Sequence, residues 1–443
     1  MLSACGSGSS DVTVTGDVPV AYAKRASSIN MNPTTGADFK AGGDLIVRDK
    51  SSASADEYNV TAGYTQGAGD VSDPEVSYDG KKIVFAMNCP AAKNPKCTGH
   101  WNIWEYDMSV GGLKGGTLRQ ITSSTDDDVD PAYLPAGAGF VFASNRQRAT
   151  VDLPSGTDTY AALDEYERER VLNLYTMDSK GANITRISVN QSHDRNPVVL
   201  ADGDIMFSRW DHVGGRNHFK VFTVKPDGTN MFVRYGAHSD GNSFLHPREM
   251  DPSGPYKGQL ASDLMPLSRT HEGGALVFVD ATNYSEQNTP ANAKVAATGG
   301  QRQVTEHALS SGGGVSPYGR VTTPYPLWDG TNRVLVSFAP CQVTKIYPDK
   351  TSRIVSCQDT NEVSAADLAR LGDMNRLATD EDADTVKNNV PPVYAVYMFN
   401  PAKQDWLIVA APPAGFIYTD PIPLQARPEP NPFKPAPVDP AAN

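Results

Sequence analysis

Five of the eight histidines fall between residues 193 and 246, where arginines and an aspartate accompany them. Imidazole, guanidinium and carboxylate groups hold an anionic ligand or a divalent metal ion when loops bring them together. Their spacing matches no metal-ligand signature such as HExxH, so hydrogen bonding in surface loops is the simpler interpretation. The candidate residues for ligand or partner contact are His193, Arg195, Arg209, Asp211, His212, Arg216, His238, His246 and Arg248.

A run of acidic residues, Asp126, Asp127 and Asp128, is the second place where side chains suggest chemistry. Calcium requires several oxygen ligands, which carboxylates supply. The run lacks the glycine and the distal glutamate of an EF-hand loop, so capping of the loop backbone is favoured over a Ca²⁺ site. We therefore predict no resident cofactor and keep Ca²⁺ as the alternative.

Other catalytic motifs are absent from the sequence. There is no GxSxG, no P-loop and no GxGxxG between a strand and a helix. The segment Cys97 to His100 has the histidine of a haem-attachment motif but lacks its first cysteine, so we expect no covalent haem in these residues. The formal net charge of −12 argues against nucleic acid as a partner. No catalytic residue is assigned.

The first residues, Leu2 to Cys5, are similar to a bacterial lipobox, and residues 6–11 are similar to the flexible tether that follows one. The resemblance implies lipid on the Cys5 sulfur and amino group, and two or more acyl chains anchor a protein stably. No apolar run is long enough for a membrane-spanning helix, so the anchor is the expected membrane contact. We expect a periplasmic or cell-surface lipoprotein, in the outer membrane.

The four remaining cysteines form an even number, as expected of disulfides in an oxidising compartment. Local pairing of Cys89 with Cys97 and of Cys341 with Cys357 is the simplest connectivity. Zinc binding is the rival interpretation, but the sequence contains no CxxC.

These residues must be positioned by a repeat that covers most of the chain. An Asp-Pro or Asn-Pro pair, then a turn, then a short apolar run recurs from Asp73, Asp130 and Asn196, and a weaker copy starts at Tyr325. Proline lacks an amide donor, Asp-Gly favours a tight hairpin turn, and the apolar run suits a buried strand. Two further strands follow in each unit. Four antiparallel strands per repeat describe a blade of a β-propeller.

The units predict an all-β propeller over residues 17–426, with six blades and seven as the alternative. A strand near residues 417–424 would return beside the N-terminal strands and close the ring. Residues 1–16 are the lipobox and tether, and an insertion near 146–170 favours a short charged helix. The Pro-rich residues 427–443 are expected to form a linker or tail.

The repeat resembles that of TolB-type propellers, in the words "DPEVSYDGKKIVFAM", "NLYTMDSKGANITRIS" and "VKPDGTNMFV". Residues 173–212 more narrowly resemble the propeller part of hydrazine synthase α-subunit-like proteins. That family carries its redox chemistry on haems attached through CxxCH, which this chain lacks. The expectation is a lipid-anchored envelope propeller that binds a protein partner or a small ligand at one end, without catalysis of its own. The alternative is the propeller module of a redox or metal-dependent enzyme.

Overall fold

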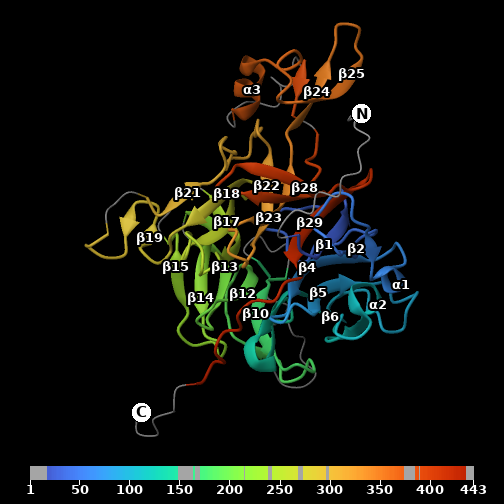
Figure 1. The fold of residues 1–443 in the computed structure, drawn as a ribbon, viewed down its shortest axis with the longest axis vertical. Coiled ribbons are helices and arrows are strands. Elements are labelled where there is room, and N and C mark those ends of the chain that lie inside the picture. The colour runs from blue at the N-terminus through green and yellow to red at the C-terminus, as the bar shows by residue number, and fades with distance from the viewer. Residues whose placement is uncertain are drawn as a thin grey trace.

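The strands of this computed structural model surround a central axis (Figure 1). The structure describes residues 17–147, 163–164, 170–213, 215–237, 242–267, 273–295, 299–373, 385–388 and 390–435. In these residues six four-stranded antiparallel sheets form, and we number them as blades 1 to 6 in chain order. The innermost strand of each blade contacts the innermost strands of its two neighbours, so the inner strands complete a ring. The predicted all-β propeller is confirmed.

Each blade runs from an inner strand beside the axis to an outer strand at the rim. From blade 1 to blade 6, the inner strands are β29 (Phe416–Pro423), β4 (Asp70–Val76), β8 (Asp128–Leu134), β12 (Asp194–Val199), β16 (Ser243–Glu249) and β22 (Arg320–Pro326). In the same order, the second strands are β1 (Val20–Ala26), β5 (Lys82–Asn88), β9 (Gly139–Ser144), β13 (Ile205–Val213), β17 (Leu260–Met265) and β23 (Val334–Ala339).

The third strands are β2 (Asp44–Arg48), β6 (Trp101–Asp107), β10 (Asn173–Met177), β14 (Arg216–Val224), β18 (Ala275–Val279) and β27 (Ala395–Asn400). The outer strands are β3 (Tyr58–Asn59), β7 (Thr117–Gln120), β11 (Thr185–Arg186), β15 (Phe232–Tyr235), β21 (Gln301–Gln303) and β28 (Asp405–Ala410). Short elements outside the blades are α1 (Ala62–Thr65), α2 (Gly112–Gly115), the 3₁₀ turn Pro135–Gly137, and the hairpin β19 (Tyr284–Glu286) with β20 (Thr289–Pro290).

Blade 1 is built from both ends of the propeller sequence. Its inner strand β29 pairs antiparallel with β1, from Val20 opposite Pro423 to Ala26 opposite Phe416. This pairing closes the ring and covers the inner edge of β1 and the outer edge of β29. The predicted return of the strand near residues 417–424 is confirmed.

The core lies between the blades because the inner and second strands are buried on both faces. In β5, for example, all residues from Ile83 to Met87 are fully buried. Three large apolar clusters each join strands of two or more neighbouring blades. This packing stabilises the fold because it removes apolar surface from water.

The connections divide between two faces because neighbouring strands in a blade run in opposite directions. We call the face where the inner strands begin the start face, and the opposite face the end face. Connections between second and third strands leave from the start face, among them residues 27–43 of blade 1. The turns between inner and second strands lie on the end face, where the chain continues after β29 into residues 424–435.

A small unit interrupts blade 6 between its second and third strands. It contains the sheet of β24 (Gln342–Ile346), β25 (Ser352–Ser356) and β26 (Val386–Lys387), with the helix α3 (Ala365–Gly372) beside it. We call it the appended unit; it projects beyond the rim at the top of Figure 1. It has an apolar cluster of its own that includes Val343 and Cys357. This unit was not predicted from the sequence.

Both predicted disulfides are present in the structure. Cys89 is bonded to Cys97 and Cys341 to Cys357. The first closes the connection between β5 and β6, and the second ties the base of the appended unit to the end of β25. In the described residues no helix has the length and apolar character needed to cross a membrane.

One strand of the predicted repeat is out of register. The weak copy in blade 6 was aligned on Tyr325 and Pro326, but the pair equivalent to Asp73-Pro74 is Thr323-Pro324. Thr323 has the positive φ of the repeat, 49°, and the break in strand pairing falls between Thr322 and Tyr325. Two X-Pro pairs two residues apart caused the error. The predicted charged helix near 146–170 falls almost wholly outside the described residues.

Candidate functional site

Every inner strand carries one residue with positive φ followed by a proline. The φ values lie between 47° and 55°, and the strand pairing is interrupted at this point in all six blades. A left-handed residue and a proline cannot both join a regular ladder, so together they form a bulge. We call these residues the axial ring: Asp73, Asp130, Asn196, His246, Thr323 and Asp420.

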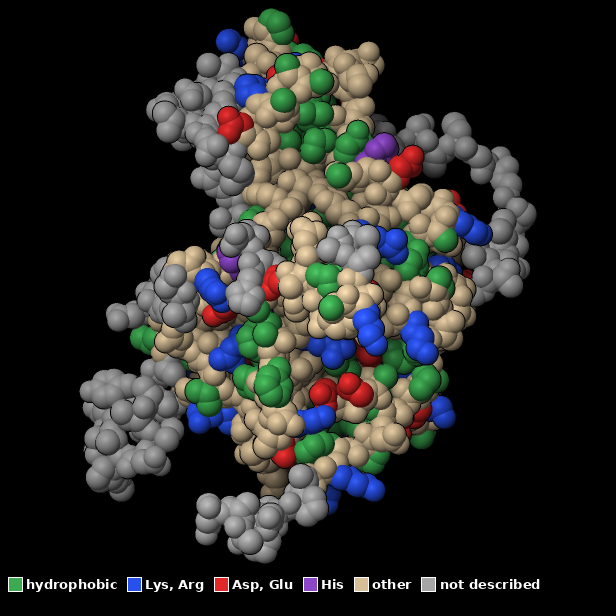
Figure 2. Space-filling model, turned by 90° about the vertical axis from the view of Figure 1, so that its left-hand side faces the viewer, with side chains coloured by type: hydrophobic (Ala, Val, Ile, Leu, Met, Phe, Trp, Pro, Cys, Tyr) green, Lys and Arg blue, Asp and Glu red, His purple; other side chains and the backbone are tan. Residues whose placement is uncertain are grey.

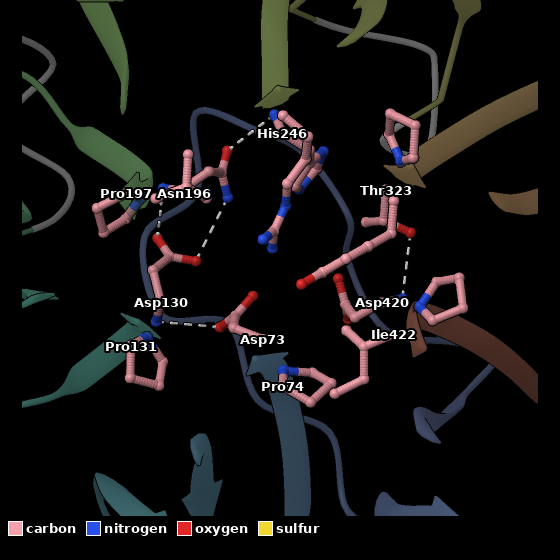
Figure 3. A pocket seen from close by; sticks show the side chains of 15 residues that line it. Asp73, Pro74, Asp130, Pro131, Asn196, Pro197, His246, Thr323, Asp420 and Ile422 are labelled. Carbon is pink, nitrogen blue, oxygen red and sulfur yellow. Dashed lines mark hydrogen bonds between the residues drawn. The ribbon is translucent and has the colours of Figure 1, made fainter. Parts of the chain in front are cut away.

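Hydrogen bonds run round the axial ring from one blade to the next (Figure 3). The backbone N–H of Asp130 donates to the Asp73 carboxylate at 3.3 Å, and that of Asn196 donates to Asp130 at 3.1 Å. The N–H of His246 donates to Asn196 at 3.4 Å, and that of Asp420 to the Thr323 hydroxyl at 3.1 Å. Short side chains with an oxygen acceptor therefore satisfy amides that the bulge removes from the sheet. This role explains Asp, Asn and Thr at these positions.

Two cavities of about 40 Å³ each adjoin at the axial ring. Both are lined by Asp73, His246, Thr323 and Asp420, and we call their combined space the axial chamber. Space of this size holds a few water molecules or a ligand of similar size. The axis of the propeller therefore has no room for a polymer.

Three carboxyl groups of neighbouring blades face the axial chamber. Burial, and then the charge of Asp73, raises the pKa of Asp130 from 3.8 to about 7. The same two causes, in the same order, raise the pKa of Asp420. Arg195 offsets part of this charge, with its Nε 3.6 Å from the Asp130 carboxylate. Like charges crowded in a buried site favour the protonated form of the carboxyl group.

His246 differs from the other residues of the axial ring because its imidazole is held by a carboxylate of its own blade. Its Nδ1 lies 3.0 Å from Oδ1 of Asp263, a fully buried residue of β17. The hydroxyl of Thr322 donates to the other oxygen of Asp263 at 3.3 Å. A carboxylate at Nδ1 fixes the orientation and tautomer of an imidazole and stabilises its protonated form.

Residues 27–43 cover the chamber on the start face. The indole N–H of Trp101 donates to the carbonyl of Ala37 at 3.2 Å, and Arg25 donates to the carbonyl of Asp38 at 3.2 Å. Arg25 is held in turn by Asp70 at 2.7 Å. These bonds involve peptide carbonyls, so they fix the path of the segment whatever its side chains.

Residues 425–431 cross the end face. The backbone N–H of Arg427 donates to the carbonyl of Tyr78 at 2.9 Å, and its guanidinium lies over the Tyr78 ring, 4.8 Å from the centroid. The Glu429 carboxylate accepts from the N–H of Ala136 at 2.7 Å. Tyr78 and Ala136 lie beside the hairpin turns of blades 2 and 3, so this segment crosses successive turns. We call it the strap.

The residues predicted to contact a ligand fall into three groups. Arg195, His246 and Arg248 line the chamber. His193 and His212 stack on the indole of Trp210, and Arg209 pairs with Asp194 at 3.1 Å. Asp211 and Arg216 lie on the β13–β14 hairpin, and His238 lies outside the described residues.

His193 lies between blades 3 and 4 rather than at the protein surface. It is fully buried, and burial lowers its pKa from 6.5 to about 4. The backbone N–H of Leu172 donates to its Nδ1 at 3.1 Å. The His193 imidazole is therefore neutral at physiological pH and links blades 3 and 4.

The acidic run makes contacts with protein groups. Asp126 pairs with Arg170 at 2.5 Å and Asp128 with Arg146 at 2.6 Å. Asp127 accepts from the backbone N–H of Trp101 at 3.1 Å. Throughout the described part of the chain, no group of three or more His, Cys, Asp or Glu side chains is arranged to hold a metal ion.

Most of the chamber was missed at the sequence level. Asp73, Asp130 and Asn196 were recognised only as starts of the repeat, while Thr323, Asp420 and Asp263 were not singled out. The signal for the ring was the recurring X-Pro pair. The signal for Asp263 was a carboxylate within a largely apolar strand, LASDLM.

Comparisons with known proteins bear on the fold. No protein-family model matches the chain, and no curated protein matches its sequence. Among solved structures, hydrazine synthase from Kuenenia stuttgartiensis superposes with a TM-score of 0.61 at 16% identity, over 94% of this chain and 48% of the other. TolB from Agrobacterium tumefaciens matches over 59% of this chain and 83% of its own, at 15% identity and a TM-score of 0.36.

The chain spans about half the length of the hydrazine synthase chain that it matches. Identity at this level establishes the fold and leaves activity, substrates and partners open. The sequence-level resemblance is confirmed in that sense. The chain is a β-propeller that resembles hydrazine synthase in its fold.

Proposed function

We propose that this protein is a binding or scaffold module of a bacterial envelope, anchored by lipid on Cys5, which recognises a protein partner through loops outside the channel. The observation that carries the proposal is the closure of the axis. Residues 27–43 line the chamber on the start face, Arg427 of the strap pairs with Glu75 of an inner strand on the end face, and the chamber is of water size. A macromolecular partner must therefore be bound by the rim or the faces.

The appended unit supports recognition at the rim. It adds nothing to ring closure, because β23 and β27 of blade 6 pair directly with each other. It nevertheless has its own core, a disulfide and a helix whose first turn is closed by a capping box of Ser364 and Asp367. On β25 it exposes Ile354, with 61% of its surface accessible. A rigid unit of this kind suits a contact surface.

The side of the propeller drawn in Figure 2 shows no continuous patch of one charge sign among its described residues. On the side that bears β15 and β19, basic and acidic side chains lie interspersed (Figure 2). The two disulfides favour an oxidising compartment such as the bacterial envelope or the cell exterior.

The test is partner capture by cross-linking in the envelope. Wild-type protein would be compared with a variant in which residues 341–388, which include both cysteines of the Cys341–Cys357 disulfide, are replaced by a short Gly-Ser linker. The proposal expects one partner to be enriched by the wild type and lost from the variant, while the thermal midpoint of the propeller is kept. Equal capture by both proteins would place recognition elsewhere. An enzyme or redox module is the second candidate, and His246 with Asp263 is the observation that favours it.

A further inference from the structure

The six blades can be compared position by position, and blade 5 departs from the rest at one buried site. The residue just before each ring residue pairs with a residue of the second strand, and that partner is Ala or Ser in five blades: Ala23, Ala86, Ala143, Ser208 and Ser337. In blade 5 the partner is Asp263, opposite Leu245. All six of these side chains are fully buried.

The ring position of the same blade departs as well. Five ring residues have a short side chain with an oxygen acceptor, four of which accept from the neighbouring backbone, and blade 5 has His246 instead. The two departures touch, with 3.0 Å between Nδ1 of His246 and Oδ1 of Asp263. A carboxylate buried in an apolar strand costs stability unless it is paired. Where a sequence breaks a rule that its own repeats obey, the cause is usually function.

We propose that His246 and Asp263 form a proton-transfer pair serving the axial chamber, and that the chamber admits a small molecule of a few heavy atoms with an O–H or N–H group. This goes beyond the scaffold role and concerns a different part of the molecule. The imidazole lines both cavities of the chamber, whereas Asp263 lies behind it in the second strand.

The proposed step moves one proton and breaks no other bond. Nε2 of His246 accepts the proton of the O–H or N–H group, which becomes the conjugate base of the ligand. The proton on Nδ1 remains directed at Asp263, whose negative charge stabilises the imidazolium. Asp263 is thus a positioning residue, held by Thr322. The proton returns to the ligand or passes to a carboxylate of the ring.

The rest of the chamber is suited to this exchange. Asp73 and Asp420 line the same two cavities as His246, and Asp130 follows Asp73 in the ring. The pKa of Asp130 is raised to about 7, so this group takes up and releases a proton near neutrality, and burial with the charge of Asp73 raises the pKa of Asp420 as well. The cations at the chamber are Arg195 beside Asp130, Arg25, which acts on Asp420, and Arg248.

The first experiment converts blade 5 to the pattern of its neighbours. The double variant His246→Asn with Asp263→Ala reproduces the ring residue of blade 4 and the second-strand residue of blades 1, 2 and 3. If the pair is kept for function, the variant folds with a thermal midpoint equal to or above that of the wild type. A midpoint lowered by about 5 °C or more would mean that the pair is structural, and would overturn the proposal.

The second experiment follows the His246 imidazole by ¹⁵N NMR, with its resonances assigned by their absence from the double variant. Methanol and formamide are the O–H and N–H probes, and acetonitrile, which has neither group, is the matched control. The proposal expects a saturable shift of the His246 Nε2 resonance with methanol or formamide and none with acetonitrile. No saturable response, or the same response to all three probes, would overturn it.

The third experiment separates positioning from packing. Asp263→Asn keeps the volume and a hydrogen-bonding group but removes the charge that stabilises the imidazolium. The pKa of His246 should then fall by about one unit, which is tenfold in its acid dissociation constant. An unchanged pKa in a folded variant would show that Asp263 does not support proton uptake by His246.

Discussion

The guanidinium of Arg427 lies 2.8 Å from the carboxylate of Glu75, a residue 352 positions earlier in the chain. Glu75 also accepts from the Tyr325 hydroxyl at 2.9 Å and pairs with Arg248. One buried carboxylate therefore joins the strap to blades 2, 5 and 6 at the end face. The strap therefore holds these three blades together directly after β29, the strand that closes the ring of blades.

Arg427→Ala should lower the free energy of unfolding by about 2 kcal/mol. Removing one member of a buried ion pair costs about 3–5 kcal/mol. Because Arg248 still neutralises Glu75 in this variant, we expect a loss below that range. Chemical denaturation measures the change. Lys434→Ala, at an exposed position of the same tail, is the control and should have no effect. Equal stability of the two variants would show that the strap does not secure the ring.

The two disulfides should protect different parts of the molecule. Loops closed by bonds 8 and 16 residues apart each contribute about 2–3 kcal/mol through the entropy of the unfolded chain. Replacing Cys341 and Cys357 by Ser should speed amide hydrogen exchange in β24 and β25 and leave β5 protected, because the appended unit has its own core. Faster exchange in every blade would contradict that independence.

Replacing Cys89 and Cys97 by Ser is the matched variant. These two residues belong to the core shared by blades 1, 2 and 6, so exchange should rise in β5 and β6 instead. The comparison needs no knowledge of the partner.

The proposed lipid anchor on Cys5 predicts where the full precursor is found in a bacterial host. Wild-type protein should partition into the membrane fraction, whereas a Cys5→Ser precursor should be soluble or stay unprocessed, because no acyl chain can be attached. Fractionation followed by immunoblotting measures the distribution. Equal membrane retention of the two forms would remove the anchor from the proposed function.

The propeller could be predicted because its signals are local. Asp-Pro, Asp-Gly and a short apolar run lie within about a dozen residues of one another, and each has a direct conformational reason. The prediction misplaced the repeat of blade 6 by two residues, because Thr323-Pro324 and Tyr325-Pro326 both fit its X-Pro pair. Blade 5 was placed without its ring residue being recognised, because His246-Pro247 carries neither Asp nor Asn.

The axial chamber could not be predicted because its residues come from six blades and meet only when the ring closes. Asp73 and Asp420 are distant in sequence, yet both line the two cavities. The histidine cluster was read as one site because its members are close in sequence. His193 directly precedes the inner strand β12, and His246 lies within the inner strand β16. Side chains alternate between the two faces of a strand, so His193 is buried between blades whereas His246 faces the axis.

Asp130 gives the protein a dependence on pH whose sign can be worked out. Its pKa is about 7 in the folded protein, against an ordinary value of 3.8. Between these values the folded protein holds a proton that the unfolded chain has released, so stability falls as the pH rises from about 4 to about 7. His193 acts in the opposite direction: its pKa is lowered to about 4, so the stability that it contributes is lost as the pH falls below about 6.5.

Asp130→Asn isolates the carboxyl group, because Asn196 shows that an amide serves at this position of the ring. The variant cannot ionise, so its free energy of unfolding relative to wild type should improve between pH 5 and pH 8, by on the order of 1–3 kcal/mol. The contribution of His193 is common to both proteins and cancels in the difference. Denaturation at both pH values measures it, with Asp227→Asn at an exposed turn as the control. A difference that stays constant with pH would mean that Asp130 is ionised throughout and that the ring stores no proton there.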